Sequence, residues 1–464
     1  MSSERILASL READACAQRL DKTGWNQHLN AARKAIDAFE SNGEDVRTLR
    51  GEHLLVSAFQ QRTNLDAYLH TLEEAAALIG GQSVVLPLRC PMFQGFYSAF
   101  SVVNEEPGYA ARNADLLDRS EELFFQMTSG GRGTATSYRA QMAFYRGNFD
   151  QARILGLQAL DEARANNQEL VALCAAEILA NTSKHLQDVS LWRFARESIR
   201  TCADNEAASN ACRKLAQVLD CTLDLSVGLL PDAPAWLREG DFGTVPAEWG
   251  FQEVEGTVPA PIVHVALLAR VQYLLYRSRR TMALSALGVM SDVYGQRSVV
   301  LDAYDGFFSA NAYHYLGDVS REQTALRKGV EAVGPDGLWV IAAEFADLFG
   351  DLLYDEVARF DPTSVAEVRR IGEGYWKKLR LMREDVLVQA PGRLTNREHQ
   401  VAKLAVQGKT NAEIAGTLHI SVRTVRYHLE NIYHKCHVSR RAQLADVLRS
   451  ANMETAAWAR ESRS

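Results

Sequence analysis

Hydrophobic side chains recur with a helical period along residues 1–390, and strand-like alternation is nearly absent outside residues 83–86. A helix places apolar residues on one face every three to four positions, whereas a strand alternates at every second position. The pattern therefore predicts an all-α fold for this region. A second helical pattern, with different spacing and charge, follows a Pro-Gly break at residues 391–392.

Turns interrupt the long helical region near Tyr109, Phe149, Trp192 and Gly317, and the first three aromatic positions are 40 and 43 residues apart. Residues 145–152 resemble the turn and second-helix start of a tetratricopeptide repeat, in which small residues let paired helices approach closely. The spacings exceed the ~34 residues of regular repeats. We therefore predict a degenerate, tetratricopeptide-like α-solenoid over residues 1–390 that serves as a sensor or oligomerisation region.

One interval departs from the helical pattern. Residues 228–261 hold five of the chain's eleven prolines, together with Trp236 and Trp249. No helix is expected to run through this insertion. Its two tryptophans could close over an apolar ligand, or they could anchor a surface connector to the helices.

At the C-terminus, local signals mark a series of short helices. Thr395 with Glu398, and Thr410 with Glu413, are T-x-x-E capping boxes, which satisfy unpaired backbone donors at a helix start. Two helices should therefore begin near 396 and 411. Ser421 can cap a third helix after a tight turn. This arrangement predicts helix-turn-helix geometry.

The third helix is amphipathic. The face that must be buried carries Val422, Val425, Leu429, Ile432 and Cys436. The opposite face carries Arg423, Tyr427, Asn431 and His434. The two flanks carry Arg426 and Glu430 on one side, and Thr424, His428 and Lys435 on the other. Polar side chains around the exposed side of such a helix are typical of major-groove recognition.

Charge supports this interpretation. Residues 393–450 contain ten Lys or Arg and four Asp or Glu, a net charge of +6, whereas the whole chain carries −7. The remainder is therefore acidic, at −13. A basic segment on an acidic protein favours phosphate binding at that segment and argues against nucleic-acid binding elsewhere.

Several spaced motifs together resemble the LuxR-type C-terminal DNA-binding domain. They are Leu394-Thr395-x-Arg397-Glu398, Asn411-x-Glu413-Ile414-Ala415, Leu418-x-Ile420-Ser421-x-x-Thr424-Val425 and His428-x-x-x-Ile432. The resemblance implies a four-helix domain within residues 391–464 that binds double-stranded DNA. The DNA-binding residues that we predict from the pattern and the resemblance are Asn411, Ser421, Arg423, Thr424, Arg426, Tyr427, His428, Glu430, Asn431, Lys435 and Arg440.

The motif also departs from the family. Arg426 stands where the family usually has Lys, and Cys436-His437 where it has Leu-Gly. Glu430 stands at a position that is often basic; it could accept from a cytosine amino group or pair with Arg426. Tyr427 could instead cover a domain interface. His428, His434 and His437 superficially suggest zinc ligands, but Cys436 faces the core, so no metal site is predicted.

Composition limits the other functions. The N-terminus lacks the apolar run of a signal peptide and residues 263–276 are too short and polar to span a bilayer, so we expect a cytoplasmic protein. Seven cysteines without a C-x-x-C pair are interpreted as reduced core thiols; Cys202, Cys212 and Cys221 could alternatively sense redox state.

No enzymatic pattern stands out. The glycine-rich residues 128–134 lack the ending of a phosphate loop and are interpreted as a helix connection. His185, His264 and His314 occur singly without a nucleophile at motif spacing. We therefore expect neither an enzyme nor a cofactor.

The sequence favours a sequence-specific DNA-binding transcription regulator whose helical region senses a small molecule or a protein. We expect a homodimer, because a single small module buries little interface. The alternative is an adaptor whose tetratricopeptide-like region binds a partner and whose helix-turn-helix makes contacts other than with DNA. A steep dependence of DNA binding on salt separates the two.

Overall fold

The computed structural model describes residues 3–18, 21–61, 63–92, 98–205, 208, 210–228, 233–238, 261–293, 298–388, 396–418, 420–435 and 444. These residues contain helices and turns and no strand, which confirms the all-α prediction. The chain divides into two compact units, Met1–Lys378 and Leu379–Ser464. No helix in the described part is long and apolar enough to cross a membrane.

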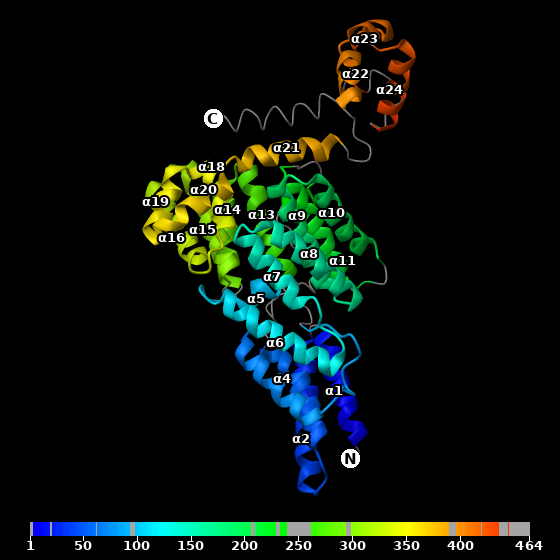
Figure 1. Ribbon diagram of the computed structural model, residues 1–464, viewed down its shortest axis with the longest axis vertical. Helices are drawn as coiled ribbons and strands as arrows, with labels where there is room; N and C mark the ends of the chain where they lie inside the picture. The colour runs from blue at the N-terminus through cyan, green and yellow to red at the C-terminus, as the bar shows by residue number, and fades with distance from the viewer. Residues whose placement is uncertain are drawn as a thin grey trace. The chain divides into compact units, whose positions relative to one another are not determined.

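The helices of the first unit are connected mostly by short turns (Figure 1). In chain order they are α1 (Ser3–Gln18), α2 (Lys22–Ser41), α3 (Arg47–Ser57), α4 (Leu65–Ile79), α5 (Ala99–Val103), α6 (Ala110–Thr128), α7 (Thr134–Tyr145), α8 (Phe149–Ala165), α9 (Glu169–Leu186), α10 (Val189–Asp204), α11 (Asn210–Ser226), α12 (Ala235–Arg238), α13 (Pro261–Tyr276), α14 (Arg280–Val293), α15 (Val299–Leu316), α16 (Val319–Val333), α17 (Trp339–Ala343), α18 (Ala346–Phe349), α19 (Asp351–Phe360) and α20 (Val365–Gly372), with 3₁₀ turns η1 (Ala58–Gln61), η4 (Gly334–Asp336) and η5 (Pro362–Ser364). Helix α21 (Tyr375–Val388) begins in the first unit and ends in the second.

Antiparallel helix pairs form the middle of this unit, and their turns share one local design. The pairs α7/α8, α9/α10 and α15/α16 are each joined by a turn with a left-handed residue: Gly147 (φ 75°), Gln187 (φ 57°) and Gly317 (φ 73°). Asp188 and Asp318 follow the last two of these residues and cap the next helix. The turns predicted near 149, 192 and 317 thus lie between paired helices, while the tetratricopeptide-like assignment stays a prediction.

Residues far apart in sequence join the two ends of this helical array. The buried Asp336 carboxylate accepts hydrogen bonds from the backbone N–H groups of Gly108 (2.7 Å) and Ala110 (2.9 Å). Arg146 Nε donates to the Asp336 carbonyl oxygen over 2.9 Å, and Val299 N donates to the Asn104 carbonyl oxygen over 2.9 Å. Helix α17 packs against both α7 and α15. The array therefore closes on itself around α7, α9, α15 and α17.

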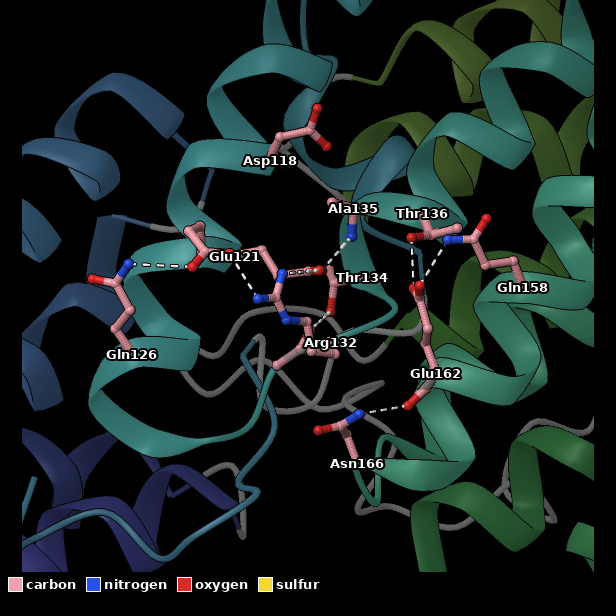
Figure 2. A network of polar contacts seen from close by, with 12 residues as sticks. Asp118, Glu121, Gln126, Arg132, Thr134, Ala135, Thr136, Gln158, Glu162 and Asn166 are labelled. Carbon is pink, nitrogen blue, oxygen red and sulfur yellow. Dashed lines mark hydrogen bonds and ion pairs between the residues drawn. The ribbon is translucent and has the colours of Figure 1, made fainter. Parts of the chain in front are cut away.

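The glycine-rich residues 129–133 connect α6 to α7, as the sequence predicted (Figure 2). The buried Glu121 carboxylate accepts from Ala135 N over 2.7 Å, and Glu162 accepts from the Thr136 hydroxyl over 2.6 Å. Two carboxylates therefore already lie at the start of α7, where a phosphate would have to bind. Burial raises the pKa of Glu121 to about 7, although the Ala135 hydrogen bond and Arg132 oppose that rise.

Residues 83–86 do not form the strand that their alternation suggested. The buried Glu52 carboxylate instead holds this segment, because it accepts from the Ser83 hydroxyl (2.5 Å) and from Val84 N (2.7 Å). In a sheet, the backbone N–H and C=O groups of a strand form hydrogen bonds with a neighbouring strand. Here the Glu52 side chain accepts from Val84 N instead.

Candidate nucleic-acid interface

The C-terminal domain is built on three described helices, α22 (Asn396–Val406), α23 (Asn411–Leu418) and α24 (Val422–Lys435). Their shared core consists of Val401, Ala402, Ala405, Ile414, Ala415, Val425, Leu429, Ile432 and Leu444. The predicted inward residues of all three helices belong to this core or pack against it, with one exception. Val422 is 38% exposed because it is the first residue of α24, where no preceding turn covers it. Cys436 and the predicted fourth helix, apart from Leu444, lie outside the described residues.

The turn before α23 has the predicted capping box. Thr410 N donates to Glu413 Oε2 over 2.7 Å, and Glu413 N donates to Thr410 Oγ1 over 3.3 Å. The Thr410 backbone and side-chain hydrogen bonds lower the pKa of Glu413. Gly408, with φ 82°, supplies the left-handed residue that ends the preceding helix. The first predicted box depends on Thr395 and Glu398, whose side chains lie outside the described residues.

Ser421 caps α24, as predicted. Its hydroxyl oxygen accepts from Thr424 N over 3.0 Å and lies 2.7 Å from the Thr424 hydroxyl. Both residues were also predicted to bind DNA. Ser421 is exposed and Thr424 is partly buried, so the helix start presents a paired set of hydroxyls next to exposed Val422. The cap fixes the direction in which α24 leaves the turn.

The exposed face of α24 carries Arg423, Arg426, Tyr427 and Glu430. Tyr427 keeps 62% of its surface exposed, and its ring centroid lies 5.9 Å from that of the partly buried His428. Among the described residues, neither arginine has a carboxylate within 4.0 Å, so Glu430 does not pair with Arg426. The two guanidinium groups are therefore available to an external anion.

The remaining predicted residues are less fully described. Asn411 begins α23 and is partly buried. Asn431 and Lys435 lie on α24, but their side chains are outside the described residues, as is the whole of Arg440. The sequence also argued against a zinc site formed by the histidines near the end of α24. Of those residues, the side chain of His434 and the whole of Cys436 and His437 lie outside the described residues. In the described part of the chain, no group of His, Cys, Asp and Glu could hold a metal ion.

The second predicted site, between Trp236 and Trp249, can be examined only at Trp236. Helix α12, a single turn within the insertion, carries it against an apolar cluster formed by Leu225, Leu237, Ala269 and Tyr273. Arg270 donates to the Leu237 carbonyl oxygen over 2.6 Å and fixes that turn. Trp236 therefore packs against the helices, as the second interpretation of the insertion, a surface connector anchored by its tryptophans, expects. Trp249 lies outside the described residues.

The cysteines and single histidines were interpreted as core residues. Cys16, Cys90, Cys174 and Cys212 are buried. His314 Nδ1 lies 2.8 Å from Glu322 Oε1. His185 is buried beside a set of polar side chains that sequence reasoning missed. The available signal was Glu177, which interrupts the apolar residues 170–180 of α9 seven positions before Lys184.

A compact three-helix core, a capped helix-turn-helix and an exposed helix with unpaired arginines define a DNA-binding helix-turn-helix protein. The family described as bacterial regulatory proteins, luxR family, matches residues 392–448. The chain is 45% identical over 62 residues to the spore germination protein GerE of Bacillus subtilis, a match that covers 13% of this chain and 84% of GerE. It therefore belongs to the luxR family of bacterial regulatory proteins and carries that family's DNA-binding domain.

A second relative is the transcriptional regulatory protein LiaR of Bacillus subtilis. It is 46% identical over 52 residues, which cover 11% of this chain and 25% of LiaR. No solved structure matches the chain. The comparisons therefore characterise the C-terminal domain, and what the helical region does has to be argued from its own residues.

Proposed function

We propose that this chain is a sequence-specific, homodimeric transcription regulator whose helical region, residues 1–390, senses a small molecule or a protein. The exposed arginines of α24 carry the DNA-binding half of this proposal. Arg423 lies on the side of α24 opposite the buried Val425, and Arg426 lies on an exposed flank of the same helix. A helix held in this way can enter a major groove without disturbing its own core.

Dimerisation follows from the small size of the domain. A single helix-turn-helix buries too little surface for tight, specific binding, and symmetric pairs overcome this by contacting two half-sites one helical turn apart. The closed helical array of the first unit is the larger surface available for self-association. We further propose that the chain acts without a cofactor or catalytic activity and, since its target is bacterial DNA, that it acts in the cytoplasm.

Binding of the full chain to genomic DNA fragments, followed by selection of the bound sequences, tests the proposal. On the selected site, we expect Arg423→Ala and Arg426→Ala each to weaken binding by about 1–3 kcal/mol, or about 5- to 150-fold. Arg193→Ala removes an exposed arginine from α10 and is the matched control, with unchanged affinity expected. Affinity should also fall steeply between about 50 and 200 mM salt.

Absence of binding at low salt would overturn the DNA-binding proposal. It would favour the adaptor alternative, in which the helix-turn-helix contacts another protein. Equal losses for Arg193→Ala and the two α24 variants would contradict the assignment of α24 as the DNA-contacting helix.

A further inference from the structure

The face of α24 that carries the two exposed arginines also carries a carboxylate. Glu430 is exposed, as Arg423 and Arg426 are. At about 100° per residue, Glu430 lies about 20° around the helix from Arg423 and about 40° from Arg426, between the two. Any approach that brings both guanidinium groups to DNA therefore brings Glu430 to the same surface.

Glu430 has no role in holding the domain together. Among the described residues its carboxylate forms no ion pair and no hydrogen bond, although Arg426 stands four positions earlier, at the spacing of a helical salt bridge. Glu430 also lies outside the set of side chains that form the core of the domain. Neither an internal ion pair nor packing therefore explains a carboxylate at this position.

A carboxylate on this face opposes DNA binding unless it meets a hydrogen-bond donor. An ionised carboxylate has only acceptors, and the phosphate and sugar oxygens of a DNA strand are acceptors as well. The DNA backbone therefore repels Glu430 and offers it no hydrogen bond. The donors that DNA presents in its major groove are the N4 amino group of cytosine and the N6 amino group of adenine.

Of these two donors, the cytosine amino group suits a carboxylate better. Adenine presents its N7 acceptor beside the N6 amino group, so a carboxylate that accepts from N6 also faces the N7 lone pair. Cytosine presents its N4 amino group without an acceptor of its own in the major groove. A side-chain amide, which has both a donor and an acceptor, matches adenine instead.

We propose that Glu430 accepts a hydrogen bond from the N4 amino group of a cytosine and selects that base in each half-site of the bound DNA. This contact rests on the proposed function, because it requires α24 to lie in the major groove. Its contribution is to specificity more than to affinity. The carboxylate weakens binding to every sequence, and the hydrogen bond offsets this only where cytosine is present.

Selection of bound sequences by the full chain tests the contact with two variants and a control. Glu430→Ala removes the acceptor, and Glu430→Gln replaces the carboxylate with an amide. The control, Glu331→Gln, removes an exposed carboxylate from α16 in the first unit. We expect the parent and the control to select one site with a cytosine at the same position of each half-site. Glu430→Ala should lose the preference at that position alone, and Glu430→Gln should change it to adenine.

A modified base tests the same hydrogen bond from the DNA side. N4-methylcytosine keeps the hydrogen that pairs with guanine and has a methyl group where the other amino hydrogen faces the groove. By fluorescence anisotropy, this base at the selected position should weaken binding of the parent about 10-fold and that of Glu430→Ala less than about 2-fold. On random-sequence DNA, Glu430→Ala should bind about 2-fold more tightly than the parent, because the repulsion between carboxylate and phosphates is removed.

Three results would overturn the cytosine contact. One is the selection of the same bases at every position by the parent and by both Glu430 variants. Another is an equal effect of N4-methylcytosine on the parent and on Glu430→Ala. The third is a lower melting temperature of Glu430→Ala, which would show that the carboxylate is paired within the protein.

The failure of this contact can be told apart from the failure of the proposed function. A parent chain that selects a DNA site to which Glu430 is indifferent keeps the regulator and refutes the cytosine contact. A parent chain that binds no DNA at low salt refutes both.

Discussion

Arginine side chains in this protein differ in whether a carboxylate accompanies them. In the helical region Arg196 lies 2.6 Å from Asp220 and 2.8 Å from Asp224, and such a pair is largely satisfied internally. On α24, Arg423 and Arg426 have no such partner among the described residues and are exposed. A guanidinium without an internal partner keeps its five donors for a phosphate or a base. The two environments are consistent with packing by Arg196 in one unit and with the proposed DNA contacts of Arg423 and Arg426 in the other.

Arg426 offers a test of which contact it makes. The luxR-type resemblance implies a lysine at this position, so we expect Arg426→Lys to retain binding to within about 3-fold, whereas Arg426→Ala loses the contact. The measurement is fluorescence anisotropy with the selected DNA site. A large loss in Arg426→Lys, confined to sites with guanine at one position, would show instead that the planar fork reads that base.

At the scale of single elements, helix ends are the most informative features. The Thr410–Glu413 capping box sets the start of α23, and both of its backbone bonds form. We expect Thr410→Ala to destabilise the C-terminal domain by about 1 kcal/mol, within the usual range for a lost cap. Thr417→Ala is a control on the same helix, because its hydroxyl only back-bonds to the Glu413 carbonyl oxygen. Hydrogen exchange of α23 amides reports the difference, and equal protection in both variants would contradict it.

The Glu121 carboxyl group, which is bonded to the start of α7, should make the stability of the fold depend on pH (Figure 2). Burial raises the pKa of Glu121 to about 7 in the folded chain, from 4.5. The unfolded chain therefore loses its proton first, and the free energy of unfolding falls as pH rises from 4.5 to about 7. The loss from this group is at most about 3.5 kcal/mol, at about 1.4 kcal/mol per pKa unit.

Glu121→Gln isolates that contribution, because the amide oxygen can still accept from Ala135 N and no longer ionises. We expect the variant's unfolding free energy to depend less on pH over this window than that of the parent, as measured by urea unfolding at several pH values. Glu177 also has a raised pKa and contributes with the same sign in both proteins, so the difference between them is the relevant quantity. If the unfolding free energies of parent and variant change with pH in parallel, the raised pKa of Glu121 is refuted.

Local elements were the part of this structure that the sequence predicted well. Turns near 149, 192 and 317, the Thr410–Glu413 box and the Ser421 cap all depend on contacts within a few residues. Val422 was placed in the core wrongly, because a helical wheel ignores whether a neighbouring turn exists to cover a first residue. Residues 83–86 were misleading because the side chain that holds them, Glu52, is about thirty positions away.

At the scale of the whole molecule, the features that sequence reasoning missed all depend on distant contacts. His185 Nε2 and Glu344 Oε1 lie 3.8 Å apart only because the array closes, with Asp336 bonded to residues more than 200 positions earlier. No local period records such a closure. The exposed face of α24 was predictable for the opposite reason, since one helix and its cap contain it.

A substitution at Asp336 tests how the helical array is held closed. Asp336→Ala leaves the backbone N–H groups of Gly108 and Ala110 without their acceptor, and each buried donor left unpaired costs about 1–3 kcal/mol. We expect a clear drop in the melting temperature of the helical region, because both buried donors lose their acceptor. Asp318→Ala, which removes the cap of α16, is the control, with a smaller effect on stability. Similar behaviour of the two variants would mean that the ends are held by other contacts.

The two-fold symmetry of the proposed homodimer leads to a prediction about the DNA site. If two chains present two α24 helices related by a two-fold axis, their half-sites must be inverted and separated by about one helical turn of DNA, 10–10.5 base pairs. The full chain should then bind an inverted pair at least about 10-fold more tightly than one half-site. Moving the half-sites by about five base pairs places them on opposite faces of the duplex and should abolish that advantage. Equal affinity for the pair, the shifted pair and the half-site, together with a monomeric mass by analytical ultracentrifugation, would refute the dimer while leaving the role of α24 intact.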